Sequence, residues 1–446
     1  MRSILQYILK ILAKIVLWKY QPEIVGVTGS VGKTSAKEAI YQVLKKQFRV
    51  RRSRENYNNE IGVPLTILGL DTAGRSFIGW LKNFFKAGIV IFWGRNYPEI
   101  LVLEMAVDRP GDMKYLLDFV PVKLGVITAI GQFPVHLEFF PEKGKLVEEK
   151  ALLVKLLSKN GLAVLNYDDL TVRMIGDDLS EKTKTIQYGF GQGADLKVFN
   201  FQFFPPAGGP AGGLERGDFG VSFKLDYQGS IVPFKLNKVL GKQSVYAAAA
   251  AVVVGLNFGL NLVEISTALR KYRALAGRAK LIKGIKNSWI IDDSYNSSPS
   301  AALAALEILE ELSRPAADIE TEVLHSSPKK TLPEVKRIAV LGDMLELGED
   351  TEAGHRQVGQ KVAATVDLLF AIGERARFIA EEARQQGLAQ EKIFEFSRPE
   401  QASLAVQKKL SPGDIVLVKG SRAIHLEKVV KEIMAKPEKA DRLLVR

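Results

Sequence analysis

A glycine-rich segment at residues 26–35, GVTGSVGKTS, limits most strongly how this chain can fold. The apolar run Ile24–Val27 reads as a buried strand leading into it, and a helical pattern, Ser35–Lys46, follows it. Glycines let the backbone turn tightly, so that amide groups at the start of the helix face a phosphate. The segment has the pattern GxxGK[ST], because Val27 stands where the commoner phosphate loop has its first glycine. We therefore predict a nucleotide-binding strand–loop–helix unit.

Two side chains of this loop carry the expected chemistry. Lys33 would neutralise the β- and γ-phosphate oxygens of the nucleotide, and Thr34 would ligate Mg²⁺. The rest of the predicted phosphate-binding loop consists of Gly29, Ser30, Val31, Gly32 and Ser35. A glycine-rich turn without a ligand is the alternative, but the preceding strand favours nucleotide binding.

Strand and helix patterns alternate along most of the chain, which is typical of α/β proteins. The first group of buried parallel strands is expected at Ile24–Val27, Ile100–Met105, Leu124–Thr128 and Leu162–Leu165. Helical patterns lie between them, for example at Leu146–Leu157. After Gly277 the alternation restarts, with strands expected at Trp289–Ile291, Arg337–Leu341, Leu368–Ile372 and Asp414–Val418.

Between these two regions the pattern changes. Short alternating runs at Val221–Tyr227 and Ile231–Leu236 indicate a small antiparallel sheet, and a helix is expected at Val245–Gly255. Pro205–Gly213 reads as a loop, and 313–335 as an exposed insertion. We predict an α/β fold with a central doubly wound P-loop ATPase-type domain, a small antiparallel sheet, and a C-terminal Rossmann-like α/β domain. The predicted boundaries are 1–22 for an N-terminal helix, 23–276 for the central domain and 277–446 for the C-terminal domain.

Composition excludes several kinds of site. The chain has no cysteine, which rules out disulfides, thiolate zinc sites and cysteine nucleophiles and fits a reducing compartment. Its four histidines make a multi-histidine metal site unexpected. A surplus of 62 Lys and Arg over 50 Asp and Glu favours anionic partners. No helix-turn-helix or basic–aromatic stacking pattern is present, so nucleic acid is not among the expected partners.

Two apolar stretches carry lysines but no acidic residue. In residues 1–20, Arg2, Gln6, Lys10 and Lys14 recur every four residues on an otherwise apolar helix. The lysines interrupt both a signal-peptide core and a membrane span, so an amphipathic helix lying on an anionic membrane surface fits best. A helix packed on its own protein is the alternative. Residues 77–93 form a second stretch of this kind, which would dock beside the first on the membrane or form a buried hairpin with it.

Several short segments together resemble the Mur ligases, which build the peptide of bacterial cell-wall precursors. The segments are TGSVGKTS at 28–35, NYNNEIGVP at 56–64, EMA at 104–106, HLE at 136–138, DDSYN at 292–296, LGDM at 341–344 and VKGSR at 418–422. The chain most resembles the branch that adds D-alanyl-D-alanine to UDP-N-acetylmuramoyl-tripeptide. The resemblance runs from about residue 23 to the C-terminal domain, and the order of the segments makes it specific.

The resemblance implies an ATP-dependent amide ligase that works through an acyl phosphate, with two Mg²⁺ ions. It places Glu104 and His136 as metal ligands beside Thr34, and Lys150 as a lysine that becomes carbamylated and also ligates metal. Arg278 and Asn296 would contact ATP, with Asn296 at the adenine. Asp343 would lie at the ribose or at a hinge. His355 matches a family histidine to which we assign no role.

The chain also departs from the family. The family's UDP-sugar-binding domain has no counterpart in the 22 or so residues before the loop, so the UDP moiety is expected to be held differently. Ala151 and Leu152 follow Lys150 where the family usually has a small residue and a glutamate, and the segment at 241–245 lacks a usual His–Asn pair. Three functions stay open: the D-alanyl-D-alanine ligase, a Mur-like ligase for a lipid-linked or polyamino-acid substrate, and a non-catalytic ATP-binding partner. The expected location is cytoplasmic, with peripheral contact to the inner face of the cell membrane.

Overall fold

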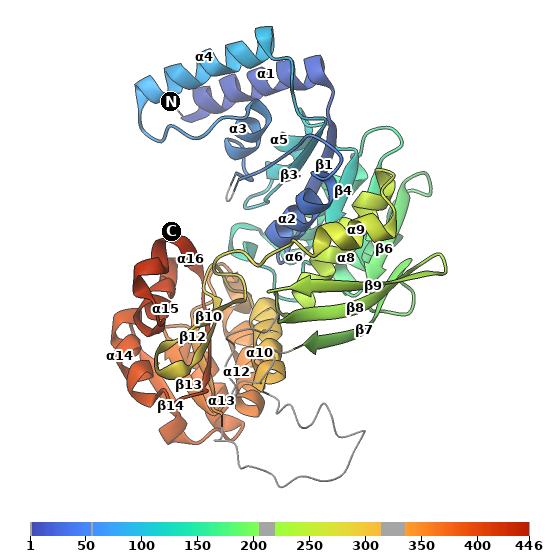
Figure 1. Cartoon of the computed structure of the whole chain (residues 1–446). Helices are drawn as coiled ribbons and strands as arrows, with labels where there is room; N and C mark the ends of the chain where they lie inside the picture. Colours follow the sequence, from blue (N-terminus) through green and yellow to red (C-terminus); the bar gives the residue numbers. More distant parts are fainter. Residues whose placement is uncertain (1, 55–56, 205–218, 314–334, 446) are drawn as a thin grey trace. The chain divides into compact units, whose positions relative to one another are not determined.

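A computed structural model describes residues 2–54, 57–204, 219–313 and 335–445 (Figure 1). The loop predicted at 205–213, and all of the insertion predicted at 313–335 except its two end residues, lie outside this part of the chain. The chain divides into two compact units. Unit 1 comprises residues 1–200, 223–234 and 245–272, and unit 2 comprises residues 201–222, 235–244 and 273–446.

The first sheet has nine strands in the order β2-β3-β1-β4-β5-β6-β7-β8-β9, with β1 between β3 and β4. Neighbouring strands pair in parallel from β2 to β7. The two-residue turn at Gln228 and Gly229 joins β8 to β9, so the hairpin expected near 221–236 continues this sheet. The strands are β1 (Glu23–Thr28), β2 (Val50–Arg52), β3 (Ile100–Glu104), β4 (Leu124–Ile127), β5 (Leu162–Asn166), β6 (Lys184–Gly189), β7 (Leu196–Phe204), β8 (Gly220–Tyr227) and β9 (Ser230–Asn237).

Helices cover both faces of this sheet, as the doubly wound prediction requires (Figure 1). β3, β4 and β5 are buried along their whole length, which explains their unbroken apolar sequences. The helices are α2 (Lys33–Leu44), α3 (Gly62–Leu68), α5 (Asp112–Leu117), α6 (Lys143–Lys155), α7 (Leu170–Asp177), α8 (Gly241–Asn257) and α9 (Leu262–Leu269). A short 3₁₀ turn, η1 (Leu137–Phe139), precedes α6.

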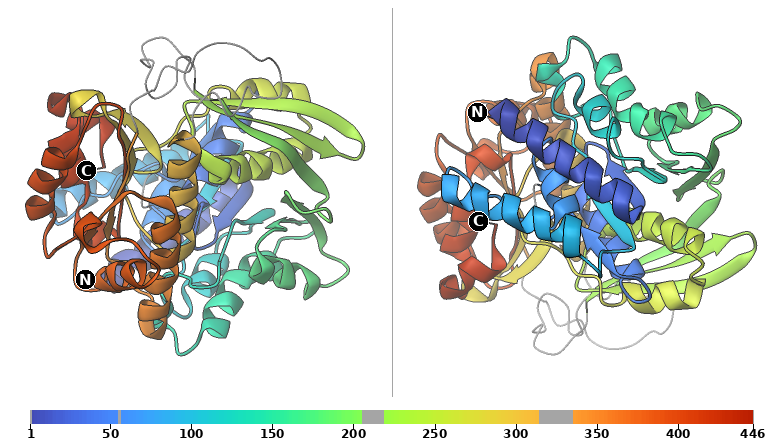
Figure 2. Two further views of the ribbon diagram at one scale, coloured as in Figure 1. Left: turned by 90° about the horizontal axis from the view of Figure 1, so that it is seen from below. Right: turned by 90° about the horizontal axis from the view of Figure 1, so that it is seen from above.

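The two apolar stretches form helices α1 (Arg2–Tyr20) and α4 (Phe77–Trp93), which lie side by side (Figure 2). Tyr20 joins their C-terminal ends, because its hydroxyl donates to the carbonyl oxygens of Val90, at 2.5 Å, and Gly94, at 2.8 Å. The inner face of α1 belongs to the core of unit 1 through Leu9, Ala13, Val16 and Leu17. No helix in the described part of the chain is long and apolar enough to cross a membrane.

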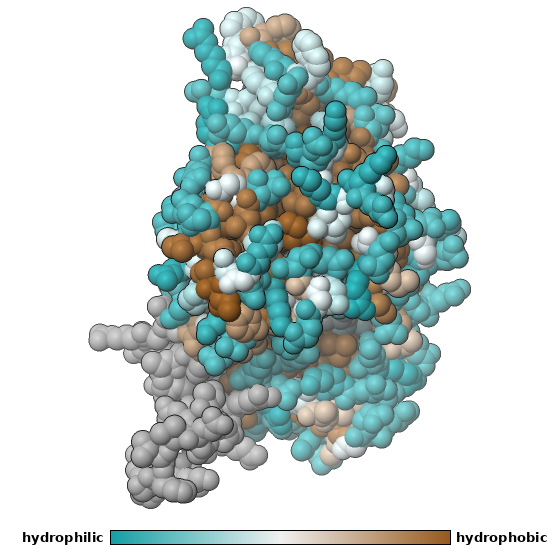
Figure 3. All heavy atoms as spheres, turned by 90° about the vertical axis from the view of Figure 1, so that its right-hand side faces the viewer, coloured by the Kyte–Doolittle hydropathy of each residue, from teal (hydrophilic) through white to brown (hydrophobic). Residues whose placement is uncertain are grey.

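Both helices also carry an apolar outer face. We call it the α1–α4 face and define it by these exposed side chains: Ile4, Tyr7, Ile11, Ile15, Trp18, Phe77, Ile78, Leu81, Phe85, Ile89, Phe92 and Trp93. The alternative that α1 packs on its own protein is therefore confirmed for its inner face only. Near the top of the view, where Figure 1 draws α1 and α4, Figure 3 shows hydrophobic patches among paler and more polar ones.

The second sheet has six strands in the order β10-β11-β15-β12-β13-β14, and only β10 runs antiparallel to its neighbour. One core cluster places α10, α12 and α13 on one face, and a second places α14, α15 and α16 on the other. The strands are β10 (Lys280–Lys283), β11 (Trp289–Asp293), β12 (Arg337–Gly342), β13 (Leu368–Ile372), β14 (Ile393–Phe396) and β15 (Ile415–Lys419). The helices are α10 (Pro299–Ser313), α12 (Thr351–Thr365), α13 (Arg377–Gln385), α14 (Pro399–Lys409), α15 (Glu427–Ile433) and α16 (Ala440–Leu443).

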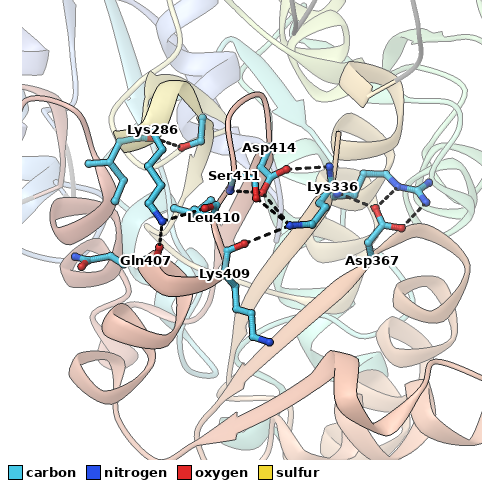
Figure 4. Close-up of polar contacts among 11 residues, drawn as sticks. Lys286, Lys336, Asp367, Gln407, Lys409, Leu410, Ser411 and Asp414 are labelled. Carbon is cyan, nitrogen blue, oxygen red and sulfur yellow. Dashed lines mark hydrogen bonds and ion pairs between the residues drawn. The ribbon is translucent and has the colours of Figure 1, made fainter. Parts of the chain in front are cut away.

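A polar cluster fixes the amino ends of this sheet (Figure 4). The buried carboxylate of Asp414, just before β15, accepts from the backbone N–H of Lys336 at 3.1 Å and of Ser411 at 2.7 Å. Arg337 is held in the same way by Asp367, which precedes β13. Ligands of open parallel sheets bind at the carboxyl ends of the strands. This cluster at the opposite ends is therefore structural.

Candidate functional site

The glycine-rich loop connects β1 to α2, as predicted. Gly29 has φ 141°, and a Cβ there would lie 2.2 Å from Oγ1 of Thr128, so no other residue fits without rearrangement. The backbone N–H groups of Ser30 and Val31 donate to the carbonyl oxygen of Ala129, at 2.6 and 3.1 Å. The loop is thus anchored to the segment that follows β4.

The first turn of α2 begins at Lys33 without a side-chain cap, because its N-cap residue is Gly32 at φ 89°. The first amides of a helix have no acceptor within the helix, and they favour an anion placed before them. The Lys33 ammonium folds back over the loop and donates to the Gly29 carbonyl oxygen at 2.7 Å. A phosphate placed at this helix end would therefore meet both the helix amides and a lysine.

Thr34 and Glu104, two predicted metal ligands, lie together. The Thr34 hydroxyl donates to Oε1 of Glu104 at 3.3 Å, and the Asn58 amide nitrogen donates to the same oxygen at 3.2 Å. Val27 pairs with Glu104 across β1 and β3, so the register of the parallel sheet carries the carboxylate to the loop. Hydroxyl and carboxylate oxygens are ligands that Mg²⁺ prefers.

The second oxygen of Glu104 faces a buried lysine that sequence reasoning missed. Nζ of Lys37, on α2, lies 3.5 Å from Oε2 of Glu104 and 3.6 Å from Oε1 of Glu38. The Lys37 and Glu104 side chains are 1% and 3% exposed, and neither of these two atoms has a hydrogen-bond partner among the described residues. Lys37 follows Lys33 by four residues, a helical spacing that places both on one side of α2 and is the only sequence signal for it.

Lys150 is buried on α6, where its surroundings lower its basicity. Burial, followed by repulsion from the Lys33 ammonium, lowers the pKa of Lys150 to about 7, against weaker opposing effects of Asp108, Asp112 and Glu149. A large fraction of this amine is therefore uncharged near neutral pH. An uncharged lysine amine beside the predicted phosphate-binding Lys33 is a candidate reactive group.

His136 precedes η1 in a left-handed conformation, with φ 71°. Its Nε2 lies 3.5 Å from Oδ1 of Asp108, a carboxylate that the sequence did not single out. The Asp108 charge also acts on Lys150, so Asp108 connects the His136 and Lys150 neighbourhoods. Unit 1 thus brings Lys33, Thr34, Glu104, His136 and Lys150 to one region at the carboxyl ends of its central strands.

A metal ion in this region would need oxygen atoms of a bound ligand in addition to those of the protein. Among the residues the structure describes, no three His, Cys, Asp or Glu side chains gather in a way that could hold a metal. Mg²⁺ at phosphate-transfer sites is held by one or two protein oxygens together with phosphate oxygens and water. Thr34 and Glu104 beside the predicted phosphate position match that donor set.

Unit 2 gathers its predicted residues at the carboxyl ends of β11, β15 and β12. The Lys419 ammonium, at the end of β15, lies 2.7 Å from Oδ2 of Asp293 and donates to the Asn296 carbonyl oxygen at 2.9 Å. This holds the loop after β11, and the Asn296 side chain is exposed. The Arg278 guanidinium stacks 4.3 Å from the centre of the Tyr295 ring, next to Asn296 in the sequence.

The chain around Gly277 is tied to the same loop. The Gly277 N–H donates to Asp292 at 3.1 Å, and its carbonyl oxygen accepts from the N–H of Tyr295 at 3.1 Å. Burial raises the pKa of Asp292 to about 6, against hydrogen bonds from Ser294 and Gly277 that favour its charged form. These bonds fix the backbone next to Arg278, from which its side chain extends.

Asp343 and His355 organise the loop after β12. Oδ1 of Asp343 accepts from the N–H groups of Arg375 and Ala376, at 2.9 and 2.7 Å, at the start of α13. Nε2 of His355 accepts from the Met344 N–H at 3.0 Å, and Nδ1 lies 2.6 Å from the Thr351 carbonyl oxygen. This pattern requires the neutral ring with its proton on Nδ1, and burial lowers the pKa of His355 accordingly. His355 therefore acts on structure, and Asp343 has at least one structural role.

Residues 27–80 and 90–255 match the family described as Mur ligase middle domain, and residues 321–422 match Mur ligase, glutamate ligase domain. The chain is 29% identical over 427 residues to the UDP-N-acetylmuramoyl-tripeptide–D-alanyl-D-alanine ligase of Bacillus subtilis, covering 96% of this chain and 79% of that protein. The enzyme of that name from Escherichia coli is 25% identical over 414 residues, covering 92% of this chain and 76% of the relative.

Solved structures agree with these matches. The crystal structure of MurF ligase from Thermotoga maritima in complex with ADP superposes with a TM-score of 0.73 at 25% identity, covering 98% of this chain and 84% of that one. MurF from Acinetobacter baumannii also gives a TM-score of 0.73, at 21% identity. The predicted fold class is confirmed.

Proposed function

The chain belongs to the Mur ligase family, and on that premise we propose that it joins D-alanyl-D-alanine to UDP-N-acetylmuramoyl-tripeptide. It is an ATP-dependent ligase that forms a carbon–nitrogen bond in the synthesis of peptidoglycan precursors. The observation that carries the choice of substrates is the identity of 29% to the Bacillus subtilis enzyme, which extends over 96% of this chain. The proposed division is 1–22, 23–276 and 277–446.

The reaction has two steps. An oxygen of the tripeptide carboxylate attacks the γ-phosphorus of ATP, the bond to the β–γ bridging oxygen breaks, and an acyl phosphate and ADP form. The amine of D-alanyl-D-alanine then attacks the acyl carbon, loses a proton, and inorganic phosphate leaves. Such chemistry needs no protein nucleophile, so the protein contributes position and charge.

Unit 1 supplies the charge at the phosphates. Lys33 leaves the Gly29 carbonyl for the β- and γ-phosphate oxygens, while Gly29–Ser35 surrounds them with backbone amides. Thr34, Glu104 and His136 are the residues that would hold magnesium, with a modified Lys150. Two Mg²⁺ ions, when bound, would offset the negative charge of the phosphates and of the substrate carboxylate.

We propose that Lys150 is carbamylated. A neutral lysine amine attacks the carbon of CO₂ and loses a proton, which leaves an anionic carbamate whose oxygens can ligate a metal. The lowered pKa of Lys150 supports this step, because it makes the neutral amine available near pH 7. The carbamate would also turn the repulsion between Lys150 and Lys33 into attraction.

Unit 2 would contact the nucleoside. Asn296 is proposed at the adenine, where its exposed side chain is available, and Arg278 is proposed to reach ATP from its stack on Tyr295. Asp343 is proposed near the ribose or at a hinge, in addition to its bonds at the start of α13.

We further propose that the enzyme works in the cytoplasm, in peripheral contact with the inner face of the cell membrane through residues 1–20 and 77–93. The apolar and basic character of both helices supports this location, since neither one contains an acidic residue.

The ligase proposal is tested by phosphate release from ATP and Mg²⁺. The purified full chain receives UDP-N-acetylmuramoyl-tripeptide and D-alanyl-D-alanine, singly and together, and the product is identified by mass spectrometry. Lys33→Ala is the inactive variant, and Lys46→Ala, an exposed lysine just beyond α2, is its matched control. Release that needs both substrates, survives in Lys46→Ala and disappears in Lys33→Ala supports the proposal. ATP binding without coupled release would refute these substrates.

A further inference from the structure

The α1–α4 face gathers most of the exposed large hydrophobic side chains of the described residues. Nineteen such side chains are exposed, and twelve of them belong to α1 or α4, which contribute 19 and 17 residues. The most exposed are Trp18 at 78%, Phe77 at 74%, and Phe85, Phe92 and Trp93 at 73% each. Soluble proteins rarely leave a continuous apolar patch of this kind without a partner. The core does not need these side chains, because other residues of the same helices fill it.

The charges that the two helices themselves carry have one sign. Neither helix contains Asp or Glu. Lys10 and Lys14 both bind Asp118, at 2.8 and 3.1 Å, so their charges are already paired. Lys82 and Lys86 are exposed, and neither forms an ion pair with any described residue. Helical periodicity puts these two lysines along one border of the apolar stripe that contains Phe85 and Ile89.

Aromatic side chains at the C-terminal ends of α1 and α4 are a second indication of membrane contact. Tyr20 clamps the C-terminal end of α1 to that of α4, so Trp18 and Trp93 occupy the same end of the face. Tryptophan is enriched at membrane–water interfaces because its ring is apolar and its N–H is polar. Long lysine side chains bordering an apolar stripe can extend to lipid headgroups while their methylene groups stay in the apolar layer.

We propose that the α1–α4 face docks on an anionic lipid bilayer, with both helices lying flat in the interface. This deepens the peripheral contact of the proposed function and names anionic lipid as the partner. A spanning arrangement is excluded for the described helices by their length and apolarity. A second copy of the chain is a poorer occupant, because its α1 and α4 would bring the same lysines against this face and no acidic side chain of their own. Anionic headgroups provide the charge that the face lacks.

The experiment is co-sedimentation of the full chain with vesicles, one set of phosphatidylcholine alone and one with phosphatidylglycerol added. We expect binding to the anionic vesicles that weakens with added salt. Phe85→Ser with Phe92→Ser, and separately Lys82→Glu with Lys86→Glu, should each lower the partition by roughly tenfold or more. The matched control is Leu170→Ser with Leu404→Ser, which removes side chains that are 61% and 62% exposed on α7 and α14, and should bind like the unmodified chain.

Each outcome has one meaning. Failure of the unmodified chain to bind anionic vesicles would overturn the proposal, and so would binding that neither pair of substitutions weakens. Light scattering adds a test of the other occupant: a dimer that Phe85→Ser with Phe92→Ser converts to a monomer, without vesicle binding, would assign the face to a second copy. Phosphate release with soluble substrates is measured on the same variants. It should be unchanged, and because vesicle binding needs no catalysis, failure of the ligase proposal is seen separately.

Discussion

Nζ of Lys37 lies 3.5 Å from Oε2 of Glu104, and both side chains are almost completely buried. The pair joins the first helix after the phosphate loop to the end of the neighbouring strand. It also leaves Oε1 of Glu104 directed at Thr34, which is the side where a metal would bind. Lys37 is therefore a positioning residue for a carboxylate of the proposed magnesium site.

Replacing this lysine should destabilise the protein and make stability depend on the metal. Lys37→Met leaves a buried carboxylate without its counter-charge, which costs about 3–5 kcal/mol of unfolding free energy. Mg²⁺ with ADP should restore more stability to this variant than to the unmodified chain, because the metal supplies the missing charge. Urea unfolding with and without Mg²⁺·ADP measures both effects. The double variant Lys37→Met, Glu104→Gln should lose less than the two single losses added together, and simple additivity would contradict the coupling.

Gly29→Ala should remove nucleotide binding while leaving most of the fold in place. The new methyl would meet the Thr128 hydroxyl at 2.2 Å, and φ 141° is a conformation that alanine avoids. Local strain of about 1–3 kcal/mol would be relieved by rearrangement of the loop. Calorimetric titration with ADP and Mg²⁺ checks the loss. Gly74→Ala is the control, because Gly74 also has positive φ but no atom near its Cβ position. Equal ADP affinity in both variants would count against the phosphate loop.

The stability of the chain in CO₂-free buffer should rise between about pH 7 and pH 10 because of Lys150. The unfolded chain keeps this amine protonated up to its ordinary pKa of 10.5, whereas in the folded chain its pKa is about 7. Unfolding therefore takes up a proton in this window, which adds up to about 1.4 kcal/mol of stability per pH unit. Below pH 7 this gain in stability is absent, because the Lys150 amine is protonated in both the folded and the unfolded chain. Lys150→Met should lack this slope in urea titrations, and an identical slope would show that Lys150 is not the group.

Carbamylation of Lys150 can also be detected directly. Bicarbonate labelled with ¹³C should produce a carbamate signal in the NMR spectrum of the full chain, and Lys150→Met should abolish it. Phosphate release should increase with added bicarbonate in protein prepared without CO₂. A spectrum that is unchanged by the substitution would remove Lys150 from the proposed metal ligands.

Acid should loosen the loop after β12 through His355. Its folded pKa is lowered by burial, so protonation favours the unfolded chain as the pH falls below the ordinary value of 6.5. At neutral pH both states hold the ring uncharged and the effect vanishes. His355→Gln should remove part of the fall in melting temperature between about pH 6.5 and pH 5. The matched control His425→Gln changes an exposed histidine and should leave that fall intact.

Features that depend on short sequence segments could be predicted from the sequence. The phosphate loop, the buried strands and both apolar helices are local patterns, and the structure has them where they were expected. Glu104 was found through a resemblance, but its approach to Lys37 depends on the register between β1 and β3, which no local pattern reveals. The same applies to Asp108 beside His136, because the two residues follow different strands.

The helix α1 shows a different limit of sequence reasoning. Its apolar residues surround most of the helix, so periodicity alone allowed either a membrane surface or a protein core. The structure uses Leu9 and Val16 for the core and leaves Trp18 outside. Which apolar side chain serves which purpose depends on where the neighbouring elements lie.

Positions on the α1–α4 face should respond differently to selection for folding and to selection for function in a cell. Phe85 and Phe92 project into solvent, so changing them takes almost nothing from the folding free energy of the isolated chain. A library screened for folded protein in the test tube should therefore accept nearly any residue at these positions. The same library screened for growth of a cell that depends on this enzyme should keep them large and apolar. The difference between the two tolerance maps would outline this surface without any assay of binding.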